Sequence, residues 1–447
     1  MTASRPAPPA ANPQTGTEQS IDAEALDARD PLASFAERFI PSEDVVAYLD
    51  GNSLGRPLRV TPDRFASFIA EDWGSRLIRS WDEQWFELPL TLGDRIGRVA
   101  LGAAAGQTVV ADSTTVLLYK LIRAAVDGRP ERREIVIDDD NFPTDRFVVE
   151  GIAAERGLTI RWIRTDPATG VLPDQVAAAV SARTAVVVLS QVAYRSGALA
   201  RTAEITRIAH DAGALVLWDL CHSAGAVPVD LDASGVDLAV GCTYKYLNGG
   251  PGAPAFAYVR TGLQDELAQP VQGWMGADDV FAMAERYRPA TGMRRFLSGT
   301  PPVVGMLAMA DMLDLIEEAG IEAIRAKSLL LTEFTIRWAD DHLAPHGVTV
   351  VSPRDPELRG SHVTLRHPAF RAVTARLWKQ GVIPDFRSPD GLRIGLSPLS
   401  TTFVELESGL RAVADALTGE QAGPAARPEG ARMSESGSAP AHDARPR

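Results

Sequence analysis

Short apolar runs alternate with stretches of helical periodicity through the first two thirds of the chain. Continuous apolar runs predict buried β-strands at 134–140, 159–165, 184–192, 214–220, 237–245 and 253–259. Apolar residues that recur every three or four positions predict helices between them, at 113–128, 144–156 and 203–213. Strands that are apolar throughout and alternate with helices are typical of an α/β fold, with a mainly parallel sheet covered on both faces.

The last third of the chain has a different order of elements. A long helix with an apolar face is predicted at 301–320. It is followed by short strands at 347–353, 361–368 and 391–398 and by a helix at 369–380. This order predicts a small C-terminal α+β domain that the long helix joins to the large sheet. We expect the large ligand-binding domain at 31–300, with an arm at 31–70 that packs on the small domain, and the linking helix and small domain at 301–417.

Composition narrows the class of protein. The two ends, 1–30 and 418–447, are rich in Pro, Ala and small polar residues, which predicts disorder. Hydrophobic residues make up 45% of the chain and charged residues 23%, as in globular proteins. The net charge of −13 argues against nucleic acid as a partner. An N-terminus without an apolar segment, and the lack of a run long enough to span a membrane, lead us to expect a cytoplasmic protein.

The sequence argues against a cysteine-based site and against a dinucleotide-binding site. The chain has only two cysteines, Cys221 and Cys242, too few for a disulfide scaffold or a cysteine-rich metal site. Both lie in apolar runs, so we expect them to be buried and reduced, and we expect no metal. No G-x-G-x-x-G follows a predicted strand, which argues against a Rossmann dinucleotide site.

Ligands of open α/β sheets bind outside the carboxyl ends of the strands. Polar and aromatic residues lie at the ends of four of these predicted strands and directly after a further apolar run, TVVAD (108–112). They are Ser113, Thr114 and Thr115 after TVVAD; Asn141, Phe142 and Asp145; Ser190; Asp219 and His222; and Tyr244 and Lys245. Each group alone has an ordinary structural explanation, such as a helix cap, a turn or a hydrogen-bonded histidine. Together they offer hydroxyls, an aromatic ring, carboxylates, an imidazole and an amine.

This combination is what a pyridoxal 5'-phosphate (PLP) site requires. Hydroxyls at a helix start suit a phosphate, and a carboxylate, an aromatic ring and a lysine suit the pyridine ring and the aldehyde of PLP. Lys245 stands between two tyrosines in GCTYKYLNGGPGAP, and a lysine is costly to bury without a purpose. The sequence therefore predicts a PLP site around Lys245 and Asp219.

Motifs make the prediction more specific. DLCHSAG, TYKYLNGG and GWMG resemble the marks of fold-type I PLP enzymes. Within that group, the chain resembles the kynureninase family from about residue 46 to 410, through an ordered set: YLDGNSLGRPL, LIRSWDEQW, DNFPTDRF, AYRSGAL, QGWMG, FLSGTPPVVGM and LRIGLSPL. The resemblance implies a fold-type I, PLP-dependent transferase-like fold with a large seven-stranded-type sheet, and a homodimer.

The resemblance also assigns roles to residues around the cofactor. Lys245 matches the lysine that binds PLP covalently and then moves protons, and Asp219 matches the partner of the pyridine nitrogen. Phe142 matches the stacking aromatic residue. Tyr244 matches a phosphate ligand that also acts in proton transfer. The further cofactor contacts implied are Thr114, Thr115, Asp145, Ser190 and His222, and from the second subunit Trp274 and Thr300.

Substrate contacts follow from the same resemblance. Arg393 matches the clamp on the substrate α-carboxylate, and Asn52 and Trp73 match further substrate-binding positions. Trp73 and the segment with Thr300 look like the bacterial form, which favours kynurenine over 3-hydroxykynurenine. Arg195 and Ser196 depart from the family pattern, which has tyrosine or lysine and then threonine there, and the resemblance implies that both lie beside the cofactor.

The implied reaction is PLP-dependent hydrolysis of L-kynurenine to anthranilate and L-alanine, which belongs to tryptophan catabolism and NAD biosynthesis. Three alternatives remain: a cysteine desulfurase or selenocysteine lyase, an aminotransferase, and a catalytically silent PLP-binding protein. The first needs a nucleophilic cysteine on a mobile loop, whereas Cys221 and Cys242 lie in apolar runs. The last would not need a substrate clamp such as Arg393.

Overall fold

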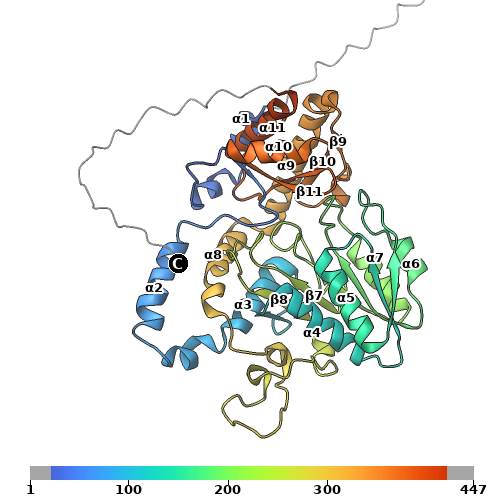
Figure 1. Ribbon diagram of the computed structural model, residues 1–447. Coiled ribbons are helices and arrows are strands. Elements are labelled where there is room, and N and C mark those ends of the chain that lie inside the picture. The colour runs from blue at the N-terminus through green and yellow to red at the C-terminus, as the bar shows by residue number, and fades with distance from the viewer. Residues whose placement is uncertain (1–21, 420–447) are drawn as a thin grey trace, which may run out of the picture.

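The computed structural model describes residues 22–419, which form two β-sheets of different size. The larger sheet and its helices form the lower body in Figure 1, and the smaller sheet with α9, α10 and α11 lies above it. No helix among the described residues has the length and apolar character needed to cross a membrane. The predicted disorder at 1–21 and 420–447 lies outside the described residues.

The larger sheet has seven strands in the order β2-β8-β7-β6-β5-β3-β4. Their bounds in that order are Thr108–Ala111, Ala255–Val259, Leu238–Gly241, Leu215–Asp219, Thr184–Ser190, Glu134–Asp138 and Thr159–Ile163. β8 is antiparallel to both of its neighbours, and all other adjacent pairs are parallel. The mainly parallel seven-stranded sheet predicted from the sequence is therefore confirmed.

Both faces of this sheet are covered, because every strand except the edge strand β4 is mostly apolar and buried. In β3, for example, Val136 packs on one face, and Ile135 and Ile137 pack on the other. Helices α4 (Thr114–Asp127) and α5 (Pro143–Arg156) cover the second face. The first face is covered by α3 (Leu88–Ile96), α6 (Pro173–Ala179), α7 (Thr202–Asp211) and α8 (Val303–Ala319).

The smaller sheet has five strands in the order β1-β11-β12-β10-β9. Their bounds in that order are Ala47–Leu49, Val382–Arg387, Gly391–Gly395, His362–Arg366 and Thr349–Val350. Helices α9 (Ile321–His342), α10 (Phe370–Lys379) and α11 (Phe403–Thr418) complete its core. β1 comes from the N-terminal arm and pairs with β11 in parallel, so the arm is built into the small domain.

Two helices span the junction between the domains where the sequence predicted one. α8 packs in the core of the larger sheet through Met306, Met309 and Leu313. The chain then turns at Gly320, whose φ of +78° is accessible to glycine, and α9 packs mostly in the core of the small domain.

The prediction of disorder at 1–30 is wrong for residues 22–30. Helix α1 (Ala23–Asp27) packs in the core of the small domain through Ala23. The Asp27 carboxylate accepts hydrogen bonds from the backbone N–H groups of Phe403 and Val404, at the start of α11. Asp30 forms a buried ion pair with Lys327 of α9, 2.6 Å apart. The polar residues of this segment are thus used in capping and pairing.

Candidate active site

Lys245 lies in the turn after β7, which ends at Gly241, earlier than predicted. Its side chain is buried, and its Nζ lies 3.2 Å from Nε2 of His222, in the turn that follows β6. The N-terminal arm closes on this turn, because the Gly55 N–H donates to the Tyr244 carbonyl over 2.8 Å. Burial and the positive charge of Lys245 keep the pKa of His222 well below its usual value. His222 is therefore neutral and can accept a hydrogen bond from the Lys245 amine.

Two buried carboxyl groups of this site, Asp219 and Asp145, interact through their charges. Asp219 ends β6 and accepts a hydrogen bond from the Cys221 N–H over 2.8 Å. Asp145, in the first turn of α5, is fully buried, and neither of its side-chain oxygens has a hydrogen-bond partner among the described residues. Burial, with the charges of Asp219 and Asp138, raises the pKa of Asp145 well above its usual value. A polar ligand is needed to satisfy this carboxyl group.

The aromatic candidate, Phe142, faces the lysine. Lys245 Nζ lies 5.9 Å from the centre of the Phe142 ring, which also meets Tyr194 edge-on at 5.3 Å. The side-chain oxygen of Asn141 accepts hydrogen bonds from the Phe142 N–H (2.7 Å) and from the Ser190 hydroxyl (2.9 Å). Asn141 thus joins the ends of β3 and β5, a supporting role that the sequence did not reveal.

The starts of α4 and α5 are in contact with each other. α4 begins at Thr114, and no side chain caps its first N–H groups, which are therefore free for an anion. The hydroxyls of Thr115 and Thr144 lie 2.8 Å apart and link the two helix starts, while the Thr114 hydroxyl lies 3.9 Å from Cys221 Sγ. The uncapped start of α4 is a place where the phosphate of PLP could bind.

Arg393 enters the site from β12 of the small domain and is almost fully buried. Its Nε donates to the Asp385 carboxylate (2.6 Å), its Nη1 to the Tyr194 carbonyl (2.9 Å) and its Nη2 to the Ser53 hydroxyl (3.0 Å). Asn52 is also buried here, and neither atom of its amide has a partner among the described residues. The guanidinium and a free amide therefore converge where the two domains meet.

Trp73, Trp274 and Thr300 are all exposed. Trp73 is 57% exposed and lines a groove of about 350 Å³ with Trp81, Trp85 and the segment 301–305. Trp274 is 47% exposed, and Thr300 is exposed just before that segment. Among the contacts formed by residues 22–419, none joins these three to Lys245 or Asp219. Within one chain, they do not belong to the site around Lys245.

The departures from the family pattern are accommodated beside the site. Arg195 pairs with Asp140 over 2.9 Å and contacts the Tyr194 hydroxyl, so its charge is turned toward the carboxylates that follow β3. Ser196 is buried and accepts from the Ala198 N–H within its own loop. Tyr194, whose carbonyl holds Arg393 and whose ring meets Phe142, is a neighbour of the site that the sequence did not single out.

Other chemistries find less support in residues 22–419. Cys221 and Cys242 are buried next to each other, with the Cys242 N–H donating to Cys221 Sγ over 3.2 Å. In the described part of the chain, no group of three or more His, Cys, Asp or Glu residues is placed to hold a metal ion. A buried lysine, an aromatic ring, two carboxyl groups and a helix start fit PLP. Asp145, whose oxygens have no partner among these residues, is influenced by the charges of Asp219 and Lys245 in this cluster.

Comparison with known proteins agrees with this chemistry. Residues 324–413 match the family model described as "Kynureninase C-terminal domain", and residues 98–365 match "Aminotransferase class-V". The chain is similar to the kynureninase of Pseudomonas fluorescens, with 42% identity over 404 residues that cover 89% of this chain and 95% of the relative. The kynureninase of Burkholderia pseudomallei (strain 1106a) is also 42% identical, over 406 residues with the same coverage.

Solved structures share the fold at lower identity. The cysteine desulfurase of Thermococcus onnurineus NA1 has a TM-score of 0.72 at 20% identity and covers 90% of this chain and 99% of its own. A mutant of C-DES with glycine covalently linked to its PLP cofactor has a TM-score of 0.74 at 20% identity, over 83% of this chain and 96% of its own. At this identity the similarity concerns the fold alone.

Proposed function

The chain belongs to the kynureninase family, and we propose that it hydrolyses L-kynurenine to anthranilate and L-alanine with PLP as cofactor. The observation that carries the proposal is the meeting of Lys245, Asp219 and Phe142 at one end of the large sheet with Arg393 from the small domain. An amine, a carboxylate and an aromatic ring serve the cofactor, and a guanidinium serves an amino-acid carboxylate. Breakdown of tryptophan is the metabolic context of this reaction.

PLP supplies an aldehyde that condenses with amines and a pyridine ring that withdraws electrons from the substrate. Lys245 would hold that aldehyde covalently until the substrate amine takes its place, and its freed amine would then move the proton of the substrate Cα. The neutral His222 next to it can accept a hydrogen bond from the amine. Asp219 would keep the pyridine nitrogen protonated, and Phe142 would stack on the ring.

Tyr244 is proposed as the acid that serves the substrate's γ-carbonyl. Burial raises the pKa of Tyr244 well above its usual value, so the phenol keeps its proton and can donate it. A donor at this carbonyl favours the addition of water, after which the Cβ–Cγ bond breaks and anthranilate leaves. The remaining three-carbon fragment takes up a proton and is released as L-alanine. The water supplies the second carboxylate oxygen of anthranilate.

Arg393 would hold the substrate's α-carboxylate through a charge-assisted hydrogen bond from its guanidinium. Asn52 lies within the same buried region with a free amide. Thr114, Thr115 and Ser190 are proposed as contacts to PLP, as is Asp145, whose carboxyl group lacks a partner among the described residues.

We also propose a homodimer in which Trp73, Trp274 and Thr300 serve the site of the second subunit. All three are exposed in the single chain and stand apart from Lys245. Such a contribution would explain why residues that match cofactor and substrate contacts of the family are not gathered around the lysine. Trp73 would then act on the aromatic part of the substrate and favour kynurenine over its 3-hydroxy form.

The test uses the purified protein reconstituted with PLP. It should be yellow, with an absorption band that borohydride abolishes, and with L-kynurenine it should release fluorescent anthranilate and alanine in equal amounts. Lys245→Ala is the matched control and should release neither. Release of sulfide from cysteine without anthranilate would instead support a cysteine desulfurase, and a colourless protein would reject the cofactor.

A further inference from the structure

His362 is a buried histidine for which neither the motifs nor the proposed reaction has a use. It begins β10 of the small domain and is fully buried, yet neither of its ring nitrogens has a hydrogen-bond partner among residues 22–419. A buried polar atom without a partner costs about 1–3 kcal/mol. The ring therefore faces a partner that these residues do not supply: a ligand or a water molecule.

The position of His362 points toward the substrate. In the pairing of β10 with β12, His362 stands opposite Gly395, and Thr364 stands opposite Arg393. Side chains alternate between the faces of a strand, so His362 shares a face with Arg393 as its diagonal neighbour. Its ring also lies 5.7 Å from the ring of His222, which contacts Lys245. His362 thus lies between the proposed carboxylate clamp and the proposed amine site.

The charge state of His362 suits a hydrogen-bond donor. Burial, with the positive charges of Arg393 and Lys245, keeps the pKa of His362 well below its usual value. The Tyr194 carbonyl lies near the ring and opposes this lowering of the pKa in part. It is not placed to form a hydrogen bond with either ring nitrogen. A neutral imidazole always carries one N–H, which it can donate to an anionic oxygen.

Arg393 leaves room for a second donor. A guanidinium has five N–H groups, and those of Arg393 already serve Asp385, the Tyr194 carbonyl and Ser53. Only Nη1 keeps an N–H without a partner among the described residues. A substrate carboxylate has two oxygens, so the guanidinium alone cannot satisfy both unless one of these contacts breaks.

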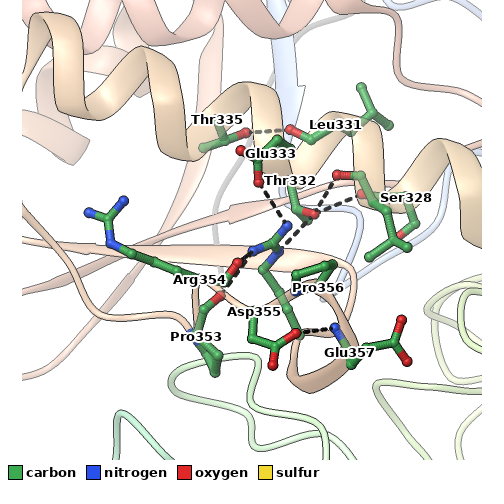
Figure 2. Close-up of polar contacts among 12 residues, drawn as sticks. Ser328, Leu331, Thr332, Glu333, Thr335, Pro353, Arg354, Asp355, Pro356 and Glu357 are labelled. Atoms are coloured by element: carbon green, nitrogen blue, oxygen red, sulfur yellow. Dashed lines mark hydrogen bonds and ion pairs between the residues drawn. The ribbon is translucent and has the colours of Figure 1, made fainter.

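The backbone that leads to His362 is fixed in place. Arg359 is fully buried and donates to the Pro353 and Arg354 carbonyls (3.0 and 2.7 Å) and to the Thr332 hydroxyl of α9 (3.0 Å). Figure 2 shows Thr332 and Glu333 of α9 close to Pro353 and Arg354. Arg359 also forms an ion pair with Glu333. The next residue, Gly360, donates to the Gly197 carbonyl in the large domain over 2.7 Å. These contacts fix the chain two residues before His362. Binding of a ligand therefore costs little conformational entropy in this segment.

We propose that His362 is a substrate-binding residue that donates a hydrogen bond to the α-carboxylate of the amino-acid substrate, on the oxygen that Arg393 does not satisfy. The inference rests on the proposed function, which supplies an amino acid held between Lys245 and Arg393. It adds a residue of the small domain to the substrate contacts and supplies a partner for one of the two unpartnered ring nitrogens.

The test compares ligands with and without the carboxylate on the PLP-loaded enzyme. Dissociation constants are measured from the cofactor absorbance for L-kynurenine and its decarboxylated amine, and for L-alanine and ethylamine. A hydrogen bond to a charged group contributes about 1.5–3 kcal/mol to binding. His362→Leu should therefore raise the dissociation constants of both amino acids by about 10- to 100-fold. The dissociation constants of the two amines should stay unchanged. His362→Gln, which keeps a donor, should recover most of the affinity, and His346→Leu, at an exposed histidine, is the control.

Equal binding of the amino acids by wild type and His362→Leu would overturn the proposal and assign a water molecule to the ring. Equal weakening of amino acids and amines would also overturn it, because packing would then be the cause. Should the leucine variant not bind PLP, His362→Phe carries the same prediction with a flat ring. The alanine and ethylamine pair needs no turnover, so a failure of kynurenine hydrolysis would leave this test intact.

Discussion

Asp138, at the end of β3, should make the stability of the protein depend on pH in an unusual direction. Burial, together with the charge of Asp140, raises the pKa of Asp138 from 3.8 to about 7, and the Asn141 side chain opposes this only in part. In the unfolded chain the carboxyl group loses its proton near its ordinary pKa. The folded state therefore binds an extra proton between about pH 4 and 7, and folding becomes less favourable as the pH rises through that range.

The magnitude follows from the shift. Each unit of pKa shift corresponds to about 1.4 kcal/mol of folding free energy. The destabilisation by Asp138 is therefore negligible below the pKa that the group has in the unfolded chain, and it reaches about 4 kcal/mol above pH 7 as an upper estimate. Between pH 5 and 8 the cost rises by about 2–3 kcal/mol. Asp138→Asn keeps the shape of the side chain and removes the titration. The advantage of the variant over wild type should therefore grow by about that amount from pH 5 to pH 8.

The assay is urea unfolding of the cofactor-free protein at pH 5, 6, 7 and 8, followed by tryptophan fluorescence. Asp174→Asn, at an exposed carboxylate of α6, is the matched control and should show no such trend. The reasoning is refuted if the difference between Asp138→Asn and wild type stays constant with pH or becomes smaller as the pH rises.

Three further perturbations test separate parts of the account. Arg393→Gln should raise the KM for L-kynurenine at least about 100-fold through loss of a charge-assisted contact, while the yellow colour remains; loss of colour would place Arg393 at the cofactor instead. Asn141→Leu removes the oxygen that accepts hydrogen bonds from Phe142 and Ser190, and it should weaken PLP binding about tenfold in an absorbance titration. Asn141→Asp keeps this acceptor and is the control. Equal PLP affinity of Asn141→Leu and wild type would contradict the supporting role of Asn141. Asp27→Ala removes two hydrogen bonds at the start of α11, where Thr402 remains as the N-cap, and should lower the free energy of unfolding by about 1 kcal/mol in urea; an unchanged midpoint would argue that these two hydrogen bonds contribute nothing.

The large sheet could be predicted from the sequence because most of its strands are short, mainly apolar runs that end in polar residues. The reversed direction of β8 could not be predicted, since an antiparallel strand buried on both faces has the same pattern as its parallel neighbours. β1 and β11 could not be predicted because a strand of three residues and one that includes Pro384 carry little periodicity. The helix at 23–27 escapes prediction because it is stabilised by tertiary contacts, which composition does not report.

The candidate site divides in the same way. Residues at the strand ends of the large sheet, such as Asp219 and Lys245, can be found from their positions along the chain. Arg393 is found through the family resemblance alone, because nothing in a short β12 indicates that it meets the large domain. His362 and Asp385 lie on the neighbouring strands, and only the pairing of β10 and β11 with β12 brings them to Arg393. Long-range pairing of short strands leaves no local signal in the sequence.

The central claim is tested most directly by mixing the PLP-loaded protein with L-kynurenine and following both products. Anthranilate fluorescence should rise together with an equal amount of L-alanine, and Lys245→Ala should give neither. Consumption of L-kynurenine without anthranilate, or no consumption by a protein that carries PLP, would contradict the account.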